Sequence, residues 1–337
     1  MNRKYLRWIL FICVLLVLLL AAITVSLSTG EMAIALTDIP KILRSKTGLD
    51  YSVLTQIRFP RIIMAFSVGG ALSLTGAILQ GIYRNPLVEP YTLGISGGAA
   101  LGVALVVVTG MHLTLGAVML PIAGFVGSVF TIFLVFFLSV KRNAININRM
   151  LLIGVMISFI ASSAMMFLMS ITTANNMHGI VFWMMGSLDE PNSFLIRVVL
   201  YSALAGLIIS YFFARPLNAL RLGHDKARHL GINTVFSLRV LFVVSSLLTG
   251  ICVAVAGVIG FVGLVIPHIV RIIIGNDYRI MLMGSFLGGS VFLLACDILA
   301  RTVIAPNELP IGVITGIAGG IVFIFVLSRT GKENSIR

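Results

Sequence analysis

Charged residues are scarce in this sequence. Lys, Arg, Asp and Glu make up 10% of the 337 residues, whereas about a quarter is usual in a soluble domain. Apolar residues account for 59%. A soluble protein of this length needs far more polar surface to cover its core. The sequence therefore predicts an all-α integral membrane protein with almost all of its chain in the bilayer.

The placement of the basic residues and the small number of cysteines exclude two further classes of protein. The net charge of +13 lies in short connections between apolar runs and not on one solvated face, which argues against nucleic-acid binding. The three cysteines lie inside apolar runs and lack the spacing of metal ligands. We interpret them as small buried hydrophobic residues (Cys13, Cys252 and Cys296).

Apolar runs of about 20 residues predict membrane-spanning helices. Nine runs qualify: 6–28, 60–82, 92–110, 113–139, 149–171, 194–213, 235–257, 280–303 and 309–328. A tenth, 259–274, is short and contains Pro267 and His268, which fits a short or broken helix buried among others. We expect a compact bundle of about ten helices, forming one permease domain over residues 1–337.

The basic residues predict the topology. Most Lys and Arg side chains fall in alternate connections, which the positive-inside rule places in the cytoplasm. Ten crossings then put both termini inside, whereas nine would put 280–303 and its flanks on the wrong sides. Residues 1–28 also resemble a signal peptide, but the apolar run is long and no A-x-A site closes it, so we expect it to be retained.

Glycines at helical spacing indicate close helix packing. Gly94, Gly98 and Gly102 are spaced by four residues, and Gly312, Gly316 and Gly320 repeat that spacing, while Gly257, Gly260 and Gly263 are spaced by three. Small residues so spaced let helix backbones approach closely. Such a bundle suits a transporter better than a receptor or an anchor.

The energy source is not evident in the chain itself. It contains no GxxxxGK[ST] phosphate loop. An ion-coupled carrier normally buries several ionisable groups in its spans. Here Asp297 is the one acid clearly inside a span, and Arg301 lies four residues further on, so the two are expected to pair.

The connection 214–234 is the largest one assigned to the cytoplasm. Leu222, Lys226 and Leu230 recur every four residues, with Gly223 and Gly231 at the ends of the pattern. We predict a short amphipathic helix that docks another protein, with a basic anchor on anionic lipid as the alternative.

Four motifs, in this order and at these spacings, resemble the permease subunits of type II ATP-binding-cassette importers, the FecCD family, over essentially the whole chain. The motifs are RFPR (58–61) with GGALSLTGAILQGIYRNPLVEPYTLGISGGAALG (69–102), FWMMGSL (182–188), ARHLGI (227–232), and GFVGLVIPHIVRIIIGNDYR (260–279) with ELPIGVITGIAGG (308–320). Members of the family carry ferric siderophores, haem and cobalamin.

The resemblance implies a homodimer in the inner (cytoplasmic) membrane, with a central pathway between the two copies. It implies two partners besides membrane lipid: an ABC ATPase dimer that binds ATP and magnesium, and an extracytoplasmic substrate-binding protein. The chain itself would be no enzyme and would hold no cofactor or metal. The alternative is an ion-coupled secondary carrier that acts without an ATPase.

The resemblance also assigns roles to residues. Asn85 and Leu87 would form one part of a cytoplasmic gate, and Ile147 and Asn148 the other, although relatives often have small hydroxyl residues at the latter two positions. The segment ARHLGI would be the coupling helix, with Ala227, Leu230 and Gly231 contacting the ATPase. Three arginines on the outer side would receive carboxylates of the binding protein: Arg58, Arg61 and Arg301.

The fifth span would line the pathway in such a permease. It carries methionines that suit a bulky ligand of variable shape, with ordinary packing as the alternative (Met156, Met165, Met166 and Met169). We interpret His112, His178 and His268 as packing or loop histidines and not as haem ligands. A ferric siderophore is the first choice of substrate; haem, cobalamin and oxyanions such as molybdate remain open.

Overall fold

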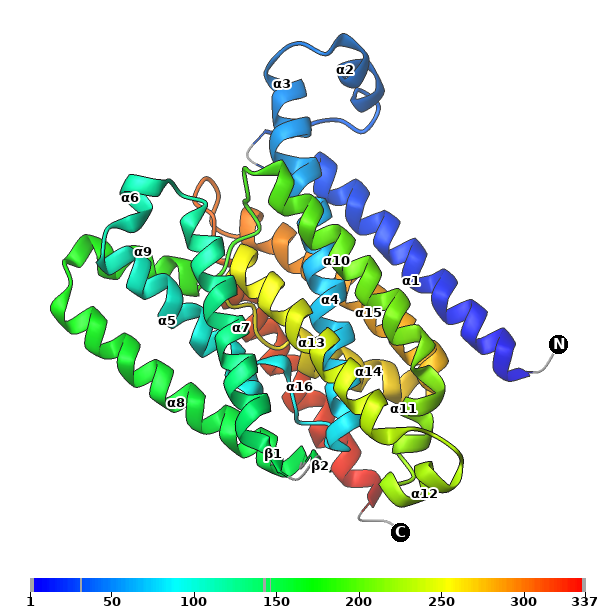
Figure 1. Ribbon diagram of the computed structural model, residues 1–337. Coiled ribbons are helices and arrows are strands. Elements are labelled where there is room, and N and C mark those ends of the chain that lie inside the picture. The colour runs from blue at the N-terminus through cyan, green and yellow to red at the C-terminus, as the bar shows by residue number, and fades with distance from the viewer. Residues whose placement is uncertain (1–2, 31, 142–143, 146, 335–337) are drawn as a thin grey trace.

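The computed structural model describes residues 3–30, 32–141, 144–145 and 147–334. In this part of the chain, seven helices are long and apolar enough to cross a membrane and three more apolar helices are shorter; these ten lie at the positions of the ten predicted apolar runs (Figure 1). They are α1 (Arg3–Ser28), α4 (Phe59–Tyr83), α5 (Ile95–Val108), α7 (Met119–Ser139), α8 (Ile147–Ile171), α10 (Ser193–Phe212), α13 (Thr234–Ala256), α14 (Val262–Ile274), α15 (Tyr278–Thr302) and α16 (Ile311–Asn334).

Short elements connect these helices. They are α2 (Ile39–Ser45), α3 (Leu49–Ser52), the π-helical η1 (Val53–Arg58), the 3-10 turn η2 (Pro90–Leu93), α6 (Met111–Leu115), β1 (Val140–Lys141), β2 (Ala144–Ile145), α9 (Ala174–Met184), α11 (Ala214–Leu220) and α12 (His224–His229). The two strands pair antiparallel, Val140 with Ile145 and Lys141 with Ala144.

Two predicted spans have different limits in the structure. The run 92–110 becomes η2 followed by a helix that begins at Ile95, and 113–139 shortens to α7, which begins at Met119. Gly110 and Gly116 adopt φ angles of 71° and 90°, a region that glycine enters without steric cost. The predicted runs already separate at Gly110, but hydropathy does not detect the break at Gly116, because its neighbours Leu115 and Ala117 are apolar.

Helix α4 forms the centre of the bundle, and nearly its whole length is buried. Gly69 of α4 faces Gly289 of α15 so closely that a Cβ on Gly69 would lie 2.4 Å from the Gly289 carbonyl oxygen. Gly76 meets α14 in the same way, at 1.8 Å from the carbonyl oxygen of Gly263. These backbone contacts use glycine where any side chain would separate the helices.

Of the predicted glycine rows, 94/98/102 packs along its length, since Gly98 and Gly102 contact the backbone of α7. The row 312/316/320 does not: Gly312 packs against Met185, but nothing lies within 4 Å of a Cβ on Gly316. The cysteine expectation is likewise right for Cys252 and Cys296 and wrong for Cys13, which is exposed on α1.

Non-helical backbone inside the bundle is satisfied by other parts of the chain. Between α13 and α14, the Tyr91 hydroxyl donates to the Ile259 carbonyl oxygen at 2.9 Å and accepts from its N–H at 3.1 Å. Ser187 N donates to Ala256 O, and Gly312 N to Met185 O. Irregular backbone at membrane depth is tolerated where it is buried in protein and hydrogen-bonded in this way.

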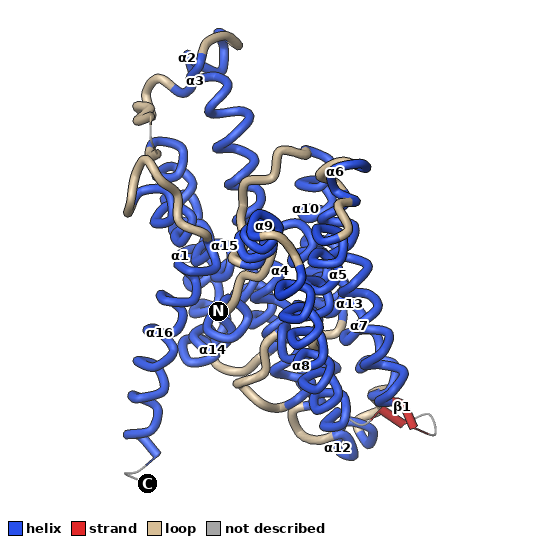
Figure 2. The backbone as a smooth tube through the Cα atoms, turned by 90° about the vertical axis from the view of Figure 1, so that its left-hand side faces the viewer, coloured by secondary structure: helices blue, strands red, loops and turns tan. Residues whose placement is uncertain are grey.

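The two ends of the bundle carry different elements. Helices α2, α3 and α6 lie at one end, hereafter the α2–α3 end, and α12, β1 and the end of α16 lie at the other, the α12 end (Figures 1 and 2). The segment with α2 and α3 extends beyond the neighbouring helices in both views. The two ends are therefore available for different partners.

Candidate functional site

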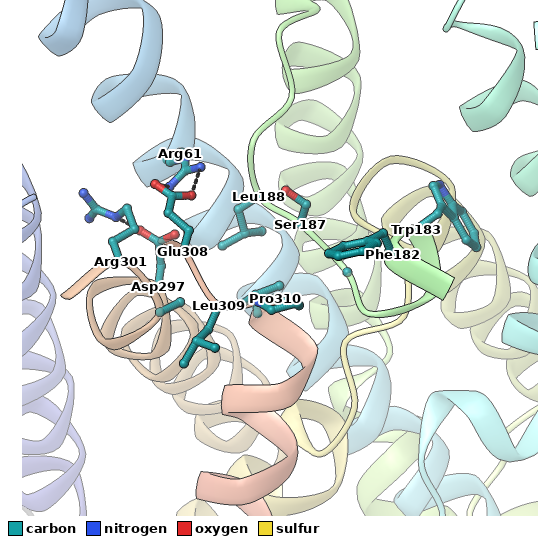
Figure 3. A pocket seen from close by; sticks show the side chains of 13 residues that line it. Arg61, Phe182, Trp183, Ser187, Leu188, Asp297, Arg301, Glu308, Leu309 and Pro310 are labelled. Atoms are coloured by element: carbon teal, nitrogen blue, oxygen red, sulfur yellow. Dashed lines mark hydrogen bonds and ion pairs between the residues drawn. The ribbon is translucent and has the colours of Figure 1, made fainter. Parts of the chain in front are cut away.

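A cavity of about 360 Å³ opens at the α2–α3 end, between α4, α15 and the segments that follow α9 and precede α16 (Figure 3). Its wall combines four charged side chains with the aromatic rings of Phe182 and Trp183. The charged residues are Arg61, Asp297, Arg301 and Glu308.

Arg61 is the centre of the charged wall. Its Nη1 and Nη2 donate to Glu308 Oε1 and Oε2 at 2.9 and 2.6 Å, the two-point geometry in which arginine binds carboxylates most strongly. Asp189 approaches the same nitrogen as Glu308 Oε2, with its Oδ2 3.5 Å from Nη2. Arg61 thus joins α4 to the segments beside α9 and α16.

Arg301 is held by α15 and by the end of α1. Its Nε donates to Asp297 Oδ2 at 3.0 Å, which confirms the predicted pair. Its Nη2 donates to Ser26 Oγ at 2.9 Å, and its Nη1 to Thr29 O at 3.3 Å. Three of the five guanidinium N–H groups therefore donate within the chain, and a docking role for Arg301 stays a prediction.

Arg58 is also buried. Its two terminal nitrogens donate to the carbonyl oxygens of Leu27 and Met32, so it closes the segment after α1 against η1. The three predicted docking arginines do gather at one end of the bundle. Their side chains are nonetheless buried and hydrogen-bonded, so direct docking stays a prediction that requires existing partners to be displaced.

Acidic loop residues complete this region. Besides Asp189, the carboxyl of Glu190 accepts the Asn192 N–H at 2.9 Å. Burial raises the pKa of Glu190, because the charged form loses solvation. Its carboxyl therefore helps to fix the loop that leads into α10.

The predicted gate residues lie at the α12 end. Asn85 Oδ1 accepts the Leu87 N–H at 2.9 Å, which closes a tight turn after α4 and leaves the Leu87 side chain exposed. Ile147 packs against the main core, whereas Asn148 is exposed at the start of α8. Leu87 and Asn148 are thus accessible, and the gate role of all four residues stays a prediction.

The predicted amphipathic helix is present as α12, bounded by Gly223 and by Gly231, whose φ is 78°. Leu230 is 62% exposed, but Ala227 is fully buried. Ala227 cannot contact an ATPase directly, since its side chain packs into the main core. Leu230 and Gly231 remain as the exposed contact candidates.

The four methionines of α8 do not share one surface. Met165 is buried, and Met169 packs against the same cluster beside Ile180 of α9. Met156 and Met166 are exposed. Ordinary packing therefore accounts for Met165, and a common pathway lining by all four is not what this arrangement shows.

The sequence analysis assigns no role to two acids of this site, Glu308 and Asp189. Asp189 stands in the segment after α9, and Glu308 in the segment before α16. Glu308 is 247 residues from Arg61 in the sequence. No periodic pattern of residues could predict a pairing over that separation.

Taken together, the helical bundle and its two dissimilar ends define a multi-pass membrane permease. The sequence profile of the FecCD transport family matches residues 18–329, and the chain belongs to that family.

Similar proteins support the assignment. The hemin transport system permease protein HmuU of Yersinia pestis is 39% identical over 83% of this chain and 84% of its own. The vitamin B12 import system permease protein BtuC of Salmonella paratyphi A is 36% identical over 98% of both chains. A solved ABC transporter described as metal-chelate type, in an inward-facing conformation, superposes with a TM-score of 0.84 at 30% identity, covering 94% of this chain and 97% of that one.

Proposed function

We propose that this permease imports a metal chelate, with a ferric siderophore as the first choice and haem or cobalamin as the other members of the class. Support comes from the family match over residues 18–329 and from the hemin and vitamin B12 permeases among its relatives. The observation that carries the proposal is the arrangement of one chain with an arginine-containing cavity at one end and the exposed helix α12 at the other.

In this proposal the α2–α3 end is extracytoplasmic and the α12 end cytoplasmic, in the inner membrane. A substrate-binding protein docks over the cavity, and an ABC ATPase binds around Leu230. Two copies of the chain enclose the pathway, and ATP binding and hydrolysis on the ATPase switch the helix packing between discrete states. The permease itself performs no covalent chemistry.

The secondary-carrier alternative has little support among the described residues. Asp297, inside α15, is paired with Arg301. It is therefore not a free proton or ion carrier, although carriers of that kind depend on such groups.

The substrate is best tested through the partner. The cognate binding protein should be purified from cells and its bound metal and organic chelate determined by elemental analysis and mass spectrometry. We expect iron in an organic chelate. Cobalt in a corrinoid, or haem, would move the substrate within the class, and an oxyanion with no organic chelate would contradict the proposal.

A further inference from the structure

A second pocket, at the α12 end, is built around three arginines. It has a volume of about 170 Å³ and is lined by Arg84, Arg221 and Arg271, which come from the turn after α4, the end of α11 and α14. Pockets for drug-sized molecules measure about 300–1,000 Å³. This pocket therefore fits a small charged group and not a whole organic ligand.

The arginines are positioned without being neutralised. Arg271 Nη2 donates to Gln80 Oε1 at 3.0 Å, and Arg221 Nη1 donates to the Asn276 carbonyl oxygen at 2.7 Å. Both acceptors are uncharged, so they orient the guanidinium groups and leave the positive charges uncompensated. Arg84 is exposed and forms no ion pair with any residue that the structure describes.

Acids do not balance this charge. Among the described residues of the pocket wall there is no Asp or Glu. The adjacent acid, Asp277, is already engaged: it accepts from Lys4 Nζ and Asn218 Nδ2, each at 3.0 Å. Burial opposes ionisation of Asp277, but these donors lower its pKa overall. Asp277 is therefore an anion committed to other partners.

Exposed apolar side chains stand next to two of these arginines in sequence, outside the pocket wall: Leu222 follows Arg221, and Ile272 follows Arg271. An oxyanion attached to an apolar body would satisfy the arginines and leave its apolar part among exposed apolar residues at this end of the bundle. Guanidinium groups match phosphate oxygens in two-point geometry, and basic pockets between spanning helices on the cytoplasmic side are suited to anionic lipid headgroups.

We propose that this pocket binds the phosphate group of an anionic phospholipid of the cytoplasmic leaflet. The proposal rests on the cytoplasmic placement of the α12 end and not on the identity of the transported substrate. Arg84 links the pocket to the coupling segment, because its Nη1 lies 3.7 Å from the position of a Cβ on Gly223, directly before α12. A bound lipid would thereby order the segment that carries Leu230.

The test uses the full chain, purified in detergent and titrated with phosphatidylglycerol, with phosphatidylcholine of the same acyl chains, and with inorganic phosphate. Binding is counted by native mass spectrometry. We expect one tightly bound phosphatidylglycerol per chain and no comparable binding of phosphatidylcholine. Arg84→Gln and Arg221→Gln should each weaken phosphatidylglycerol binding about fivefold, and the double variant about 25-fold.

The matched control is Arg215→Gln, which removes the same charge from an exposed position of α11 outside the pocket wall and should leave lipid binding unchanged. Arg271 is left intact because it is tied to Gln80. Unchanged unfolding temperatures would show that the variants fold.

Three results would overturn the proposal. The first is phosphatidylglycerol binding that the double variant does not alter. The second is equally tight binding of inorganic phosphate, which would make the pocket a site for the free ion. The third is loss of ATPase affinity in the double variant with lipid binding intact, which would make it a protein contact. Failure of substrate uptake would test the proposed function and would leave this binding measurement unaffected.

Discussion

Arg61 and Glu308 form a two-point ion pair across 247 residues of sequence, with N–O distances of 2.9 and 2.6 Å. The Arg61 side chain is 7% exposed and that of Glu308 is 50% exposed. Glu308 can therefore leave toward solvent while Arg61 stays in place. This difference in exposure explains how Arg61 could take part in docking: a carboxylate of the binding protein would replace Glu308 as its partner.

Exchange of carboxylates predicts opposite effects for the two partners. Glu308→Gln should strengthen docking of the binding protein by roughly fivefold, about 1 kcal/mol, because Arg61 no longer has to release an internal anion. Arg61→Glu should weaken docking, with a slower association rate and strong dependence on salt. Association kinetics at low and high ionic strength measure both effects.

Docking that is unchanged in both variants would show that Arg61 is not part of the interface.

Displacement of Glu308 from Arg61 would also act on the segments beside α9 and α16, which Arg61 joins to α4 through Asp189 and Glu308. Since Glu308 precedes α16 by only a few residues, docking at this point would reach a spanning helix directly.

The coupling role of α12 predicts a separable defect. Leu230→Asp should put an unpaired charge into an apolar contact with the ATPase, at a cost of about 2 kcal/mol or more. We expect the permease to fold while ATPase affinity and substrate-stimulated hydrolysis collapse. The control is Leu113→Asp on α6 at the opposite end, where the side chain is 79% exposed. Normal ATPase binding and transport by the Leu230 variant would rule out 227–232 as the coupling segment.

Close backbone contact predicts which glycines are sensitive. A Cβ on Gly76 would lie 1.8 Å from the Gly263 carbonyl oxygen, so Gly76→Ala should separate α4 from α14 and destabilise the fold by about 1–3 kcal/mol. Gly316→Ala is the matched control, because nothing lies within 4 Å of its Cβ position. Thermal unfolding in detergent compares the two; equal stability would contradict the packing described here.

The homodimer predicts a contact between like residues near its two-fold axis. In a variant that lacks Cys13, Cys252 and Cys296, Leu87→Cys should crosslink permease to permease if the two Cα atoms come within about 7 Å. Crosslinking should be strongest in the inward-closed state and should block uptake until the bond is reduced. Failure with both short and long reagents, while transport continues, would contradict the homodimer and the gate assignment together.

Hydropathy predicted the positions of the ten apolar helices, including the short α14 with Pro267 inside it. It placed the break at Gly110, between the runs 92–110 and 113–139, but not the one at Gly116, which stands between apolar residues. The motif resemblance singled out three arginines that do lie at one end of the bundle, but it did not predict that their side chains are buried. Burial depends on Glu308, Ser26 and the carbonyl groups after α1, which are distant in sequence and have no pattern of their own.

The predicted coupling segment was also predictable only in part. The glycines at 223 and 231 correctly marked the limits of α12. Which of its side chains face the bundle was not predictable, since a six-residue helix holds less than two turns. In the structure the Ala227 side chain is buried and the Leu230 side chain is exposed.

The central claim is that transport through this chain is driven by ATP on a partner and supplied by a binding protein. It is tested most directly in vesicles that contain the permease with its ATPase, by measuring uptake of the chelate loaded on the binding protein. We predict that the chelate accumulates only when ATP is present on the side of the membrane where the ATPase lies and the binding protein is supplied, and that the Leu230→Asp variant does not accumulate it. An imposed proton gradient should not substitute for ATP. Accumulation by vesicles holding the chain alone, driven by a proton gradient without ATPase or binding protein, would contradict the claim.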